Sequence, residues 1–167
     1  GCFAKIHELP SQPEGAEALF APLPDQDFMV GLAVSGGGSR AATFAAAALE
    51  ALAELPVQVG TEKRSVLETV SYMSSVSGGS LATAYYVTKK PPKSEPMLVQ
   101  DALSPRYREF FSAYKTTMQS NFQRSAVFRQ LVFFRALNPT KLAYSLSEVW
   151  DSEFLGDMTF AQLYERE

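Results

Sequence analysis

Residues 28–40 read FMVGLAVSGGGSR, and this stretch decides the fold. The continuous apolar run at 28–34 is typical of a buried parallel strand. The glycines that follow it predict a tight turn at 35–39, and the alanine-rich segment 40–55 predicts a buried helix. One face of that helix carries Phe44, Ala48, Leu52 and Leu55, and the alanine-rich remainder is apolar nearly all round, so we expect a closely packed helix.

The same order of elements recurs further along the chain. Residues 66–73 have weaker strand character, residues 74–80 are a second small-residue turn, and residues 81–87 continue as a helix. Alternating strands and helices predict an α/β domain with a parallel sheet and helices on both faces. After an exposed loop the pattern predicts a helical insert above the sheet, with helices at about 98–124, 126–137, 141–153 and 159–166.

Composition narrows the class of protein. The chain has 167 residues, 46% of them hydrophobic, and a net charge of −3, which is typical of one packed domain and excludes general disorder. The acidic balance and the lack of Lys/Arg blocks argue against a nucleic-acid partner. Cys2 and His7 are the only residues of their types, so an internal disulfide and a Cys/His zinc site are excluded. We expect no metal and no cofactor.

The beginning of the chain predicts a leader and an anchor. Residues 1–26 hold four of the ten prolines and form a leader or linker, and residues 27–167 form the domain. The pair Gly1-Cys2 is similar to the end of a bacterial lipoprotein signal, which predicts a lipid anchor at Cys2 and a membrane-associated protein of the bacterial cell envelope. The alternative is a chance cysteine near the end of a fragment and a cytoplasmic location.

The first candidate motif is the glycine turn. Gly36, Gly37 and Gly38 let several amide N–H groups point outward together at a helix N-terminus, where they would hold a phosphate or an oxyanion. Arg40 opposes the helix dipole, so it either contacts an anion or extends into solvent. The turn, read as Gly36-x-Gly38-x-x-Ala41, also fits the loose dinucleotide fingerprint. A further alternative is a tight turn that only allows close packing of the helix.

The second candidate motif is Ser75-Val76-Ser77-Gly78-Gly79. It is similar to the nucleophile elbow G-x-S-x-G, with Ser75 in place of the first glycine and Gly79 as the last. Ser77 would be the nucleophile. The alternative is a Ser/Gly turn that caps a helix. Because both turns follow neighbouring parallel strands, we expect serine and amides to share one crevice at the carboxyl ends of the strands.

A serine nucleophile needs a base, and none is evident. The only histidine, His7, lies in the leader and is interpreted as a surface residue. The five aspartates do not precede glycine and are interpreted as ordinary loop or helix-end acids: Asp25, Asp27, Asp101, Asp151 and Asp157.

These motifs resemble those of the patatin-like phospholipase family, which is related to the core of the cytosolic group IV phospholipases A2. The resemblance is carried by residues 31–41 and 74–80, and the segments 138–140 and 155–160 are similar to bacterial members. It extends over about residues 27–167. It implies that the chain forms part of a patatin-like three-layer α/β sandwich. It also implies that the substrates are phospholipids or other acyl lipids and that the protein works at a membrane surface.

The resemblance also implies roles for individual residues. Ser77 would be the nucleophile of a Ser-Asp dyad, Gly36, Gly37 and Gly38 the oxyanion hole, and Arg40 an added anion contact. The family's aspartate lies in an Asp-Gly motif, which is absent here, so the chain is interpreted as an N-terminal part that needs the rest of the same polypeptide for catalysis. Ala41 and Ser75 depart from the family pattern.

Three alternatives remain at this stage. Residues 126–137 form either an acyl-facing lid or a core-packing helix. The 36–41 turn could belong to a dinucleotide- or phosphate-binding module instead of a hydrolase. The protein could also be a non-catalytic patatin-like protein of the envelope.

Overall fold

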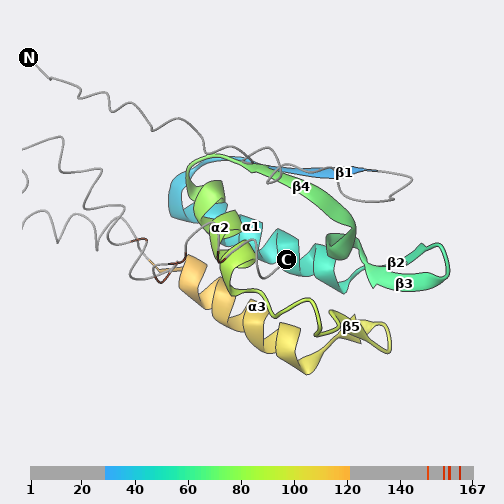
Figure 1. The fold of residues 1–167 in the computed structure, drawn as a ribbon. Coiled ribbons are helices and arrows are strands. Elements are labelled where there is room, and N and C mark those ends of the chain that lie inside the picture. Colours follow the sequence, from blue (N-terminus) through green and yellow to red (C-terminus); the bar gives the residue numbers. More distant parts are fainter. Residues whose placement is uncertain (1–28, 121–149, 151–155, 157, 159–161, 163–167) are drawn as a thin grey trace, which may run out of the picture.

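The computed structural model describes residues 29–120, 150, 156, 158 and 162. Their main elements form three layers (Figure 1): a parallel strand pair, two helices packed beneath it, and a third helix beneath those. In chain order the elements are β1 (Val30–Val34), α1 (Gly38–Glu54), β2 (Pro56–Val59), β3 (Glu62–Ser65), the 3₁₀ turn η2 (Val66–Thr69), β4 (Val70–Ser75), α2 (Gly78–Lys89), β5 (Leu98–Val99), β6 (Ala102–Leu103) and α3 (Pro105–Met118).

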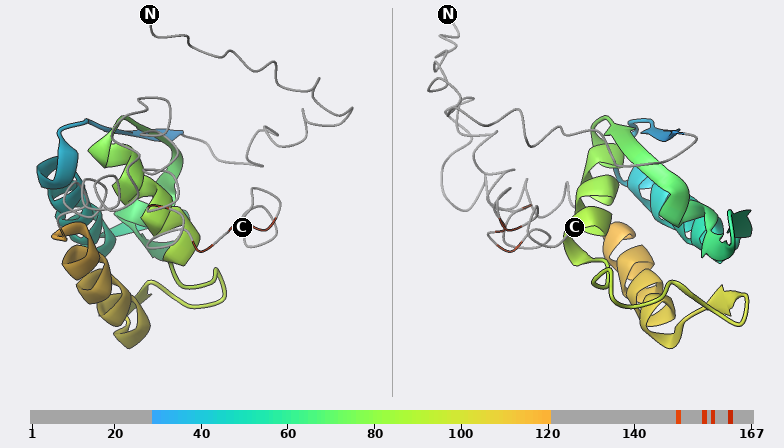
Figure 2. Two further views of the ribbon diagram at one scale, coloured as in Figure 1. Left: turned by 90° about the vertical axis from the view of Figure 1, so that its left-hand side faces the viewer. Right: turned by 45° about the vertical axis from the view of Figure 1, so that its right-hand side comes forward.

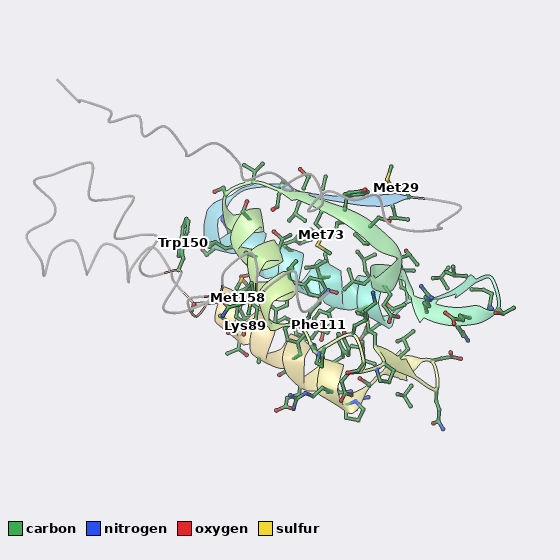
Figure 3. The ribbon with its side chains drawn as sticks, in the orientation of Figure 1. Met29, Met73, Lys89, Phe111, Trp150 and Met158 are labelled. Carbon is green, nitrogen blue, oxygen red and sulfur yellow. The ribbon has the colours of Figure 1, made fainter. Side chains whose placement is uncertain are left out.

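The predicted α/β fold with a parallel sheet is confirmed. β1 and β4 pair in parallel, and Val34 stands beside Ser75, so the two strands end at the same edge. Alternate side chains face the helices, and Met73 lies between sheet and helices in Figure 3. Met29 projects from the opposite side and is 73% exposed. Among the described residues, both helices next to the sheet lie on one of its faces (Figures 1 and 2).

Helix α1 is closely packed on its alanine-rich side, and Leu52 is partly buried against the core, but the helix is not buried all round. Phe44 is 76% exposed, whereas Leu49 is 1% exposed. The small side chains of α1 allow α2, which begins with Gly78 and Gly79, to approach closely, so packing density favours the alanine face over the larger residues. The buried residues of α1 are Ala42, Ala45, Ala46, Leu49 and Ala53.

Helix α3 packs against α1 and α2 on the side away from the sheet, as Figure 2 shows from two directions, and not above the sheet as predicted. Its buried residues recur at helical spacing: Tyr107, Phe111, Tyr114 and Met118. The rings of Phe111 and Tyr114 stack on Tyr86 and Tyr85 of α2. The Tyr114 hydroxyl donates to the Ala82 carbonyl oxygen at 2.7 Å. Burial, followed by the neighbouring Tyr86 and Tyr85, raises the pKa of Tyr114 well above its ordinary value.

A hairpin between α1 and β4 was not predicted. β2 and β3 pair in antiparallel order around Gly60, whose φ of 59° favours glycine. The strand expected at 66–73 begins only at Val70, because Ser65 and Glu68 form a capping box that starts the η2 turn. The helix predicted at 81–87, by contrast, begins earlier than expected, at Gly78.

The helix predicted over 98–124 is replaced by a short hairpin followed by α3. The hairpin turns at Gln100 and Asp101, whose φ angles are 51° and 65°. Such a turn usually contains glycine or asparagine, so its sequence signal was missing. The start of α3 carried a clear signal, because Ser104 caps the helix and Pro105 occupies its first turn.

Several predictions fall outside the described residues. These are the leader at 1–26 with Cys2 and His7, the segment 126–137, and most of the helices expected at 141–153 and 159–166. Within the described part of the chain, no helix combines the length and apolarity needed to cross a membrane.

Candidate active site

The two small-residue turns meet at one end of the sheet. Both leave the edge where β1 and β4 end, and the Val76 amide donates to the Val34 carbonyl oxygen at 3.2 Å. A Cβ built on Gly36 would lie 3.1 Å from the Cβ of Ser77. The structure therefore brings Ser77 and the start of the glycine turn into contact, as parallel pairing of the two strands requires.

Ser77 occupies a strained position between β4 and α2. Its φ is 55° and its ψ is −123°, a conformation that residues with a Cβ rarely adopt. Such strain costs about 1–3 kcal/mol and is concentrated at functional sites. Ser77 is also exposed, so its hydroxyl can be reached from solvent. This strand-to-helix geometry is that of a nucleophile elbow.

Glycine is required after Ser77 because other backbone occupies the space. A Cβ on Gly78 would lie 2.8 Å from the Gly38 carbonyl carbon, and a Cβ on Gly79 would lie 2.6 Å from the Ser35 carbonyl oxygen. Real Cβ atoms essentially never approach this closely, so a side chain at either position would push the two turns apart.

Among the described residues, the glycine turn ends in amide donors that have no backbone partner. Gly37 has φ 143° and precedes the first turn of α1, and Gly38 has φ 65°. Within residues 29–120 the amides of Gly37 and Gly38 donate to no backbone acceptor. Such amides at a helix N-terminus can receive developing negative charge.

Arg40 lies in the first turn of α1 and is exposed. In the described part of the chain its guanidinium group forms no ion pair or hydrogen bond. A cation at this end of a helix opposes the helix dipole, so a nearby anion would stabilise it.

Ser75, which stands where the elbow motif has its first glycine, points toward α2. Its hydroxyl oxygen is 2.7 Å from the hydroxyl oxygen of Thr83. Sequence reasoning missed Thr83. No local signal marks it, because it meets Ser75 only when α2 folds back beside the end of β4.

Among the described residues Asp101 is the only aspartate. It lies in the β5–β6 hairpin, and its carboxylate forms an ion pair with Lys63 at 2.6 Å. Figure 1 shows both hairpins at the end of the molecule opposite the junction of β4 and α2. The structure thus separates Asp101 from Ser77. The other four aspartates and His7 lie outside the described residues.

A dinucleotide-binding module would need an acidic residue at the end of the second strand to bind a ribose. β4 ends in Ser74 and Ser75, without the carboxylate that would bind a ribose. Glu68, which falls within the segment 66–73 predicted as a strand, accepts a hydrogen bond from the Ser65 amide at 2.7 Å in the η2 capping box.

Comparison with known proteins agrees with this geometry. Residues 32–167 match the family model described as "Patatin-like phospholipase", which covers both turns. No curated protein and no solved structure gives a significant match to the chain. Since the matched region is well over half of the chain, the chain belongs to the patatin-like phospholipase family, a family of lipid acyl hydrolases.

Proposed function

We propose that this protein is a serine acyl hydrolase that cleaves carboxylic ester bonds in phospholipids, lysophospholipids or other acyl lipids, with Ser77 as the nucleophile. The observation that carries the proposal is the strained, exposed Ser77 beside Gly36. A hydroxyl and amide donors at one strand edge suit acyl transfer, in which the nucleophile and the oxyanion donors act on one carbonyl group.

The reaction proceeds through an acyl-enzyme. The Ser77 Oγ attacks the ester carbonyl carbon while its proton passes to a carboxylate, and the carbonyl oxygen becomes an oxyanion held by amides of Gly36, Gly37 and Gly38. Collapse of this intermediate breaks the ester C–O bond, and the leaving alcohol takes the proton. Water then attacks the acyl group with the same carboxylate as base, which releases the fatty acid and restores Ser77.

The carboxylate is proposed to be an aspartate of an Asp-Gly motif located beyond these 167 residues. The ion pair of Asp101 with Lys63, far from the elbow, supports this assignment. We propose that Arg40 contributes an anion contact, with the phosphate of a phospholipid as its partner. Its exposed position in the first turn of α1 supports this role.

The proposal includes attachment to a membrane of the bacterial envelope through an acylated Cys2, which the Gly1-Cys2 sequence supports. Metabolic labelling with a fatty-acid probe should mark the full-length protein and fail in Cys2→Ala. Labelling that persists in Cys2→Ala would contradict the anchor and leave the hydrolase proposal intact.

The central test is covalent labelling of the full-length protein with a fluorophosphonate, followed by an assay of fatty-acid release from phospholipid and lysophospholipid. Ser77→Ala should abolish both signals. Ser80→Ala is the matched control, because Ser80 lies in the first turn of the same helix and should retain both. Equal activity of Ser77→Ala and the unaltered protein would refute the proposal. A full-length protein that neither labels nor hydrolyses would point to the non-catalytic alternative.

A further inference from the structure

The elbow contains a side-chain bridge that its motif does not require. The Ser75 and Thr83 hydroxyl oxygens are 2.7 Å apart, and Thr83 is 6% exposed. Ser75 ends β4 and Thr83 lies in α2, so the bridge joins the element before Ser77 to the element after it. A glycine at position 75 would have no atom to form it.

The direction of the bridge follows from counting hydrogens. The Thr83 oxygen is also 3.1 Å from the Gly79 carbonyl oxygen and 3.2 Å from the Ser80 carbonyl oxygen, and its single hydrogen can go to one main acceptor. Both hydroxyl hydrogens are used when Ser75 donates to Thr83 and Thr83 donates to the helix carbonyls. This arrangement is a hydrogen-bonded chain from the end of β4 into the first turn of α2.

We propose that Ser75 and Thr83 are a pair of positioning residues that hold Ser77 in its strained backbone conformation. This inference rests on the function proposed above. The backbone bonds around Ser77 are mostly local to the turn: the Gly79 amide donates to the Val76 carbonyl oxygen at 3.0 Å, and the Ser80 and Leu81 amides donate to the Ser77 carbonyl oxygen at 2.9 Å and 3.3 Å. The bridge adds a side-chain link between β4 and α2 to these bonds and to the bond from the Val76 amide to Val34. The bridge closes the loop around Ser77, so losing it lets the Ser77 hydroxyl move relative to the amides of the glycine turn.

Removing one hydroxyl of the bridge leaves the other hydroxyl with different remaining hydrogen-bond partners. In Ser75→Ala, Thr83 keeps the carbonyl oxygens of Gly79 and Ser80 as acceptors. In Thr83→Val, which is nearly isosteric, the half-buried Ser75 hydroxyl loses the partner shown for it. Thr83→Val should therefore be the more harmful change. Thr83→Ser keeps a hydroxyl group at this position and should therefore keep the labelling rate and kcat close to those of the unaltered protein.

The experiment measures the rate constant of fluorophosphonate labelling and the kcat and KM of ester hydrolysis in the full-length protein. Thr83→Val should lower the labelling rate and kcat by about 10-fold or more, because small displacements of a nucleophile have large effects, and KM should be unchanged. Ser75→Ala should lower the labelling rate and kcat by a smaller factor than Thr83→Val does. The double variant should be no slower than Thr83→Val, because both changes remove the same bridge.

Thr88→Val is the matched control. Thr88 lies in the same helix, is 7% exposed, and its hydroxyl donates to the Ala84 carbonyl oxygen at 2.8 Å. It should lower thermal stability in the same way as Thr83→Val without slowing labelling. If Thr83→Val proves unfolded, the comparison of Ser75→Ala with Thr88→Val decides the same question.

Hydrogen exchange of the Gly79 and Ser80 amides provides a readout that does not need activity, since both amides bond across the elbow. Their exchange should accelerate in Thr83→Val and Ser75→Ala and not in Thr88→Val. Unchanged labelling and exchange in both elbow variants, while Ser77→Ala still abolishes labelling, would overturn the positioning pair and spare the hydrolase. If the unaltered protein does not label, the proposed function fails, and a positioning pair for catalysis fails with it, whatever the exchange rates show.

Discussion

The carbonyl group of Gly38 lies where a side chain on Gly78 would have to go: a Cβ there would stand 2.8 Å from the Gly38 carbonyl carbon. The first turns of α1 and α2 are therefore in backbone contact. The glycine turn and the serine turn form a single unit, and a change in one must displace the other.

Gly78→Ala should consequently destabilise the protein by about 1–3 kcal/mol, the usual cost of inserting a methyl group into filled space. Chemical denaturation measures this change, and fluorophosphonate labelling should fall with it. Gly31→Ala is the control, because a Cβ on Gly31 meets no described atom within 4 Å. The control should stay within about 0.5 kcal/mol of the unaltered protein. Equal stability of the two variants would contradict the close contact of the turns.

Ser77→Gly should be more stable than Ser77→Ala. Glycine accepts a φ of 55° and a ψ of −123° without strain, whereas alanine keeps the Cβ that causes it. The strain released is about 1–3 kcal/mol, from which about 0.5–1 kcal/mol is lost to the greater freedom of glycine in the unfolded chain. Melting temperatures of the two variants decide the point, and neither should label. A less stable Ser77→Gly would show that position 77 is unstrained.

Tyr114→Phe should change how stability depends on pH. The buried phenol of Tyr114 has a raised pKa in the native state, so above pH about 10 the unfolded chain loses this proton first. The native protein is therefore stabilised below this pH and loses that contribution as the pH rises. Denaturant titrations from pH 7 to pH 11 should show a smaller alkaline loss in Tyr114→Phe than in the unaltered protein.

At neutral pH the same variant removes the hydrogen bond to the Ala82 carbonyl oxygen and should cost about 1 kcal/mol. The rate of Ser77 labelling should be unaffected, because Tyr114 lies between α2 and α3. Identical alkaline behaviour of both proteins would mean that Tyr114 is not shielded from water.

Leu49→Ala and Phe44→Ala test the orientation of α1. Leu49 is 1% exposed, so its truncation should cost about 2–5 kcal/mol. Phe44 is 76% exposed, and its truncation should change the free energy of unfolding by less than about 0.5 kcal/mol. Chemical denaturation of both variants provides the comparison. The reverse order would contradict this orientation of α1.

Much of the fold was predictable because its signals are local. The apolar run before Ser35 marked β1, the glycines of the first turn marked the start of α1, and Ser77-Gly78-Gly79 marked the second strand-to-helix turn. Each signal depends on residues that are adjacent in the chain. The β5–β6 hairpin was not predicted, because Gln100 and Asp101 adopt positive φ without the glycine or asparagine that usually marks such a turn.

By itself, the sequence determined the strand–turn–helix units, the identity of the candidate nucleophile and the family, because these reside in contiguous motifs. Only the tertiary structure decided which face of α1 is buried, that Gly36 lies beside Ser77, and that Thr83 meets Ser75. These contacts join residues from different elements. They depend on strand register, on helix rotation and on how closely small side chains allow two helices to pack, and no single stretch of the chain contains that information.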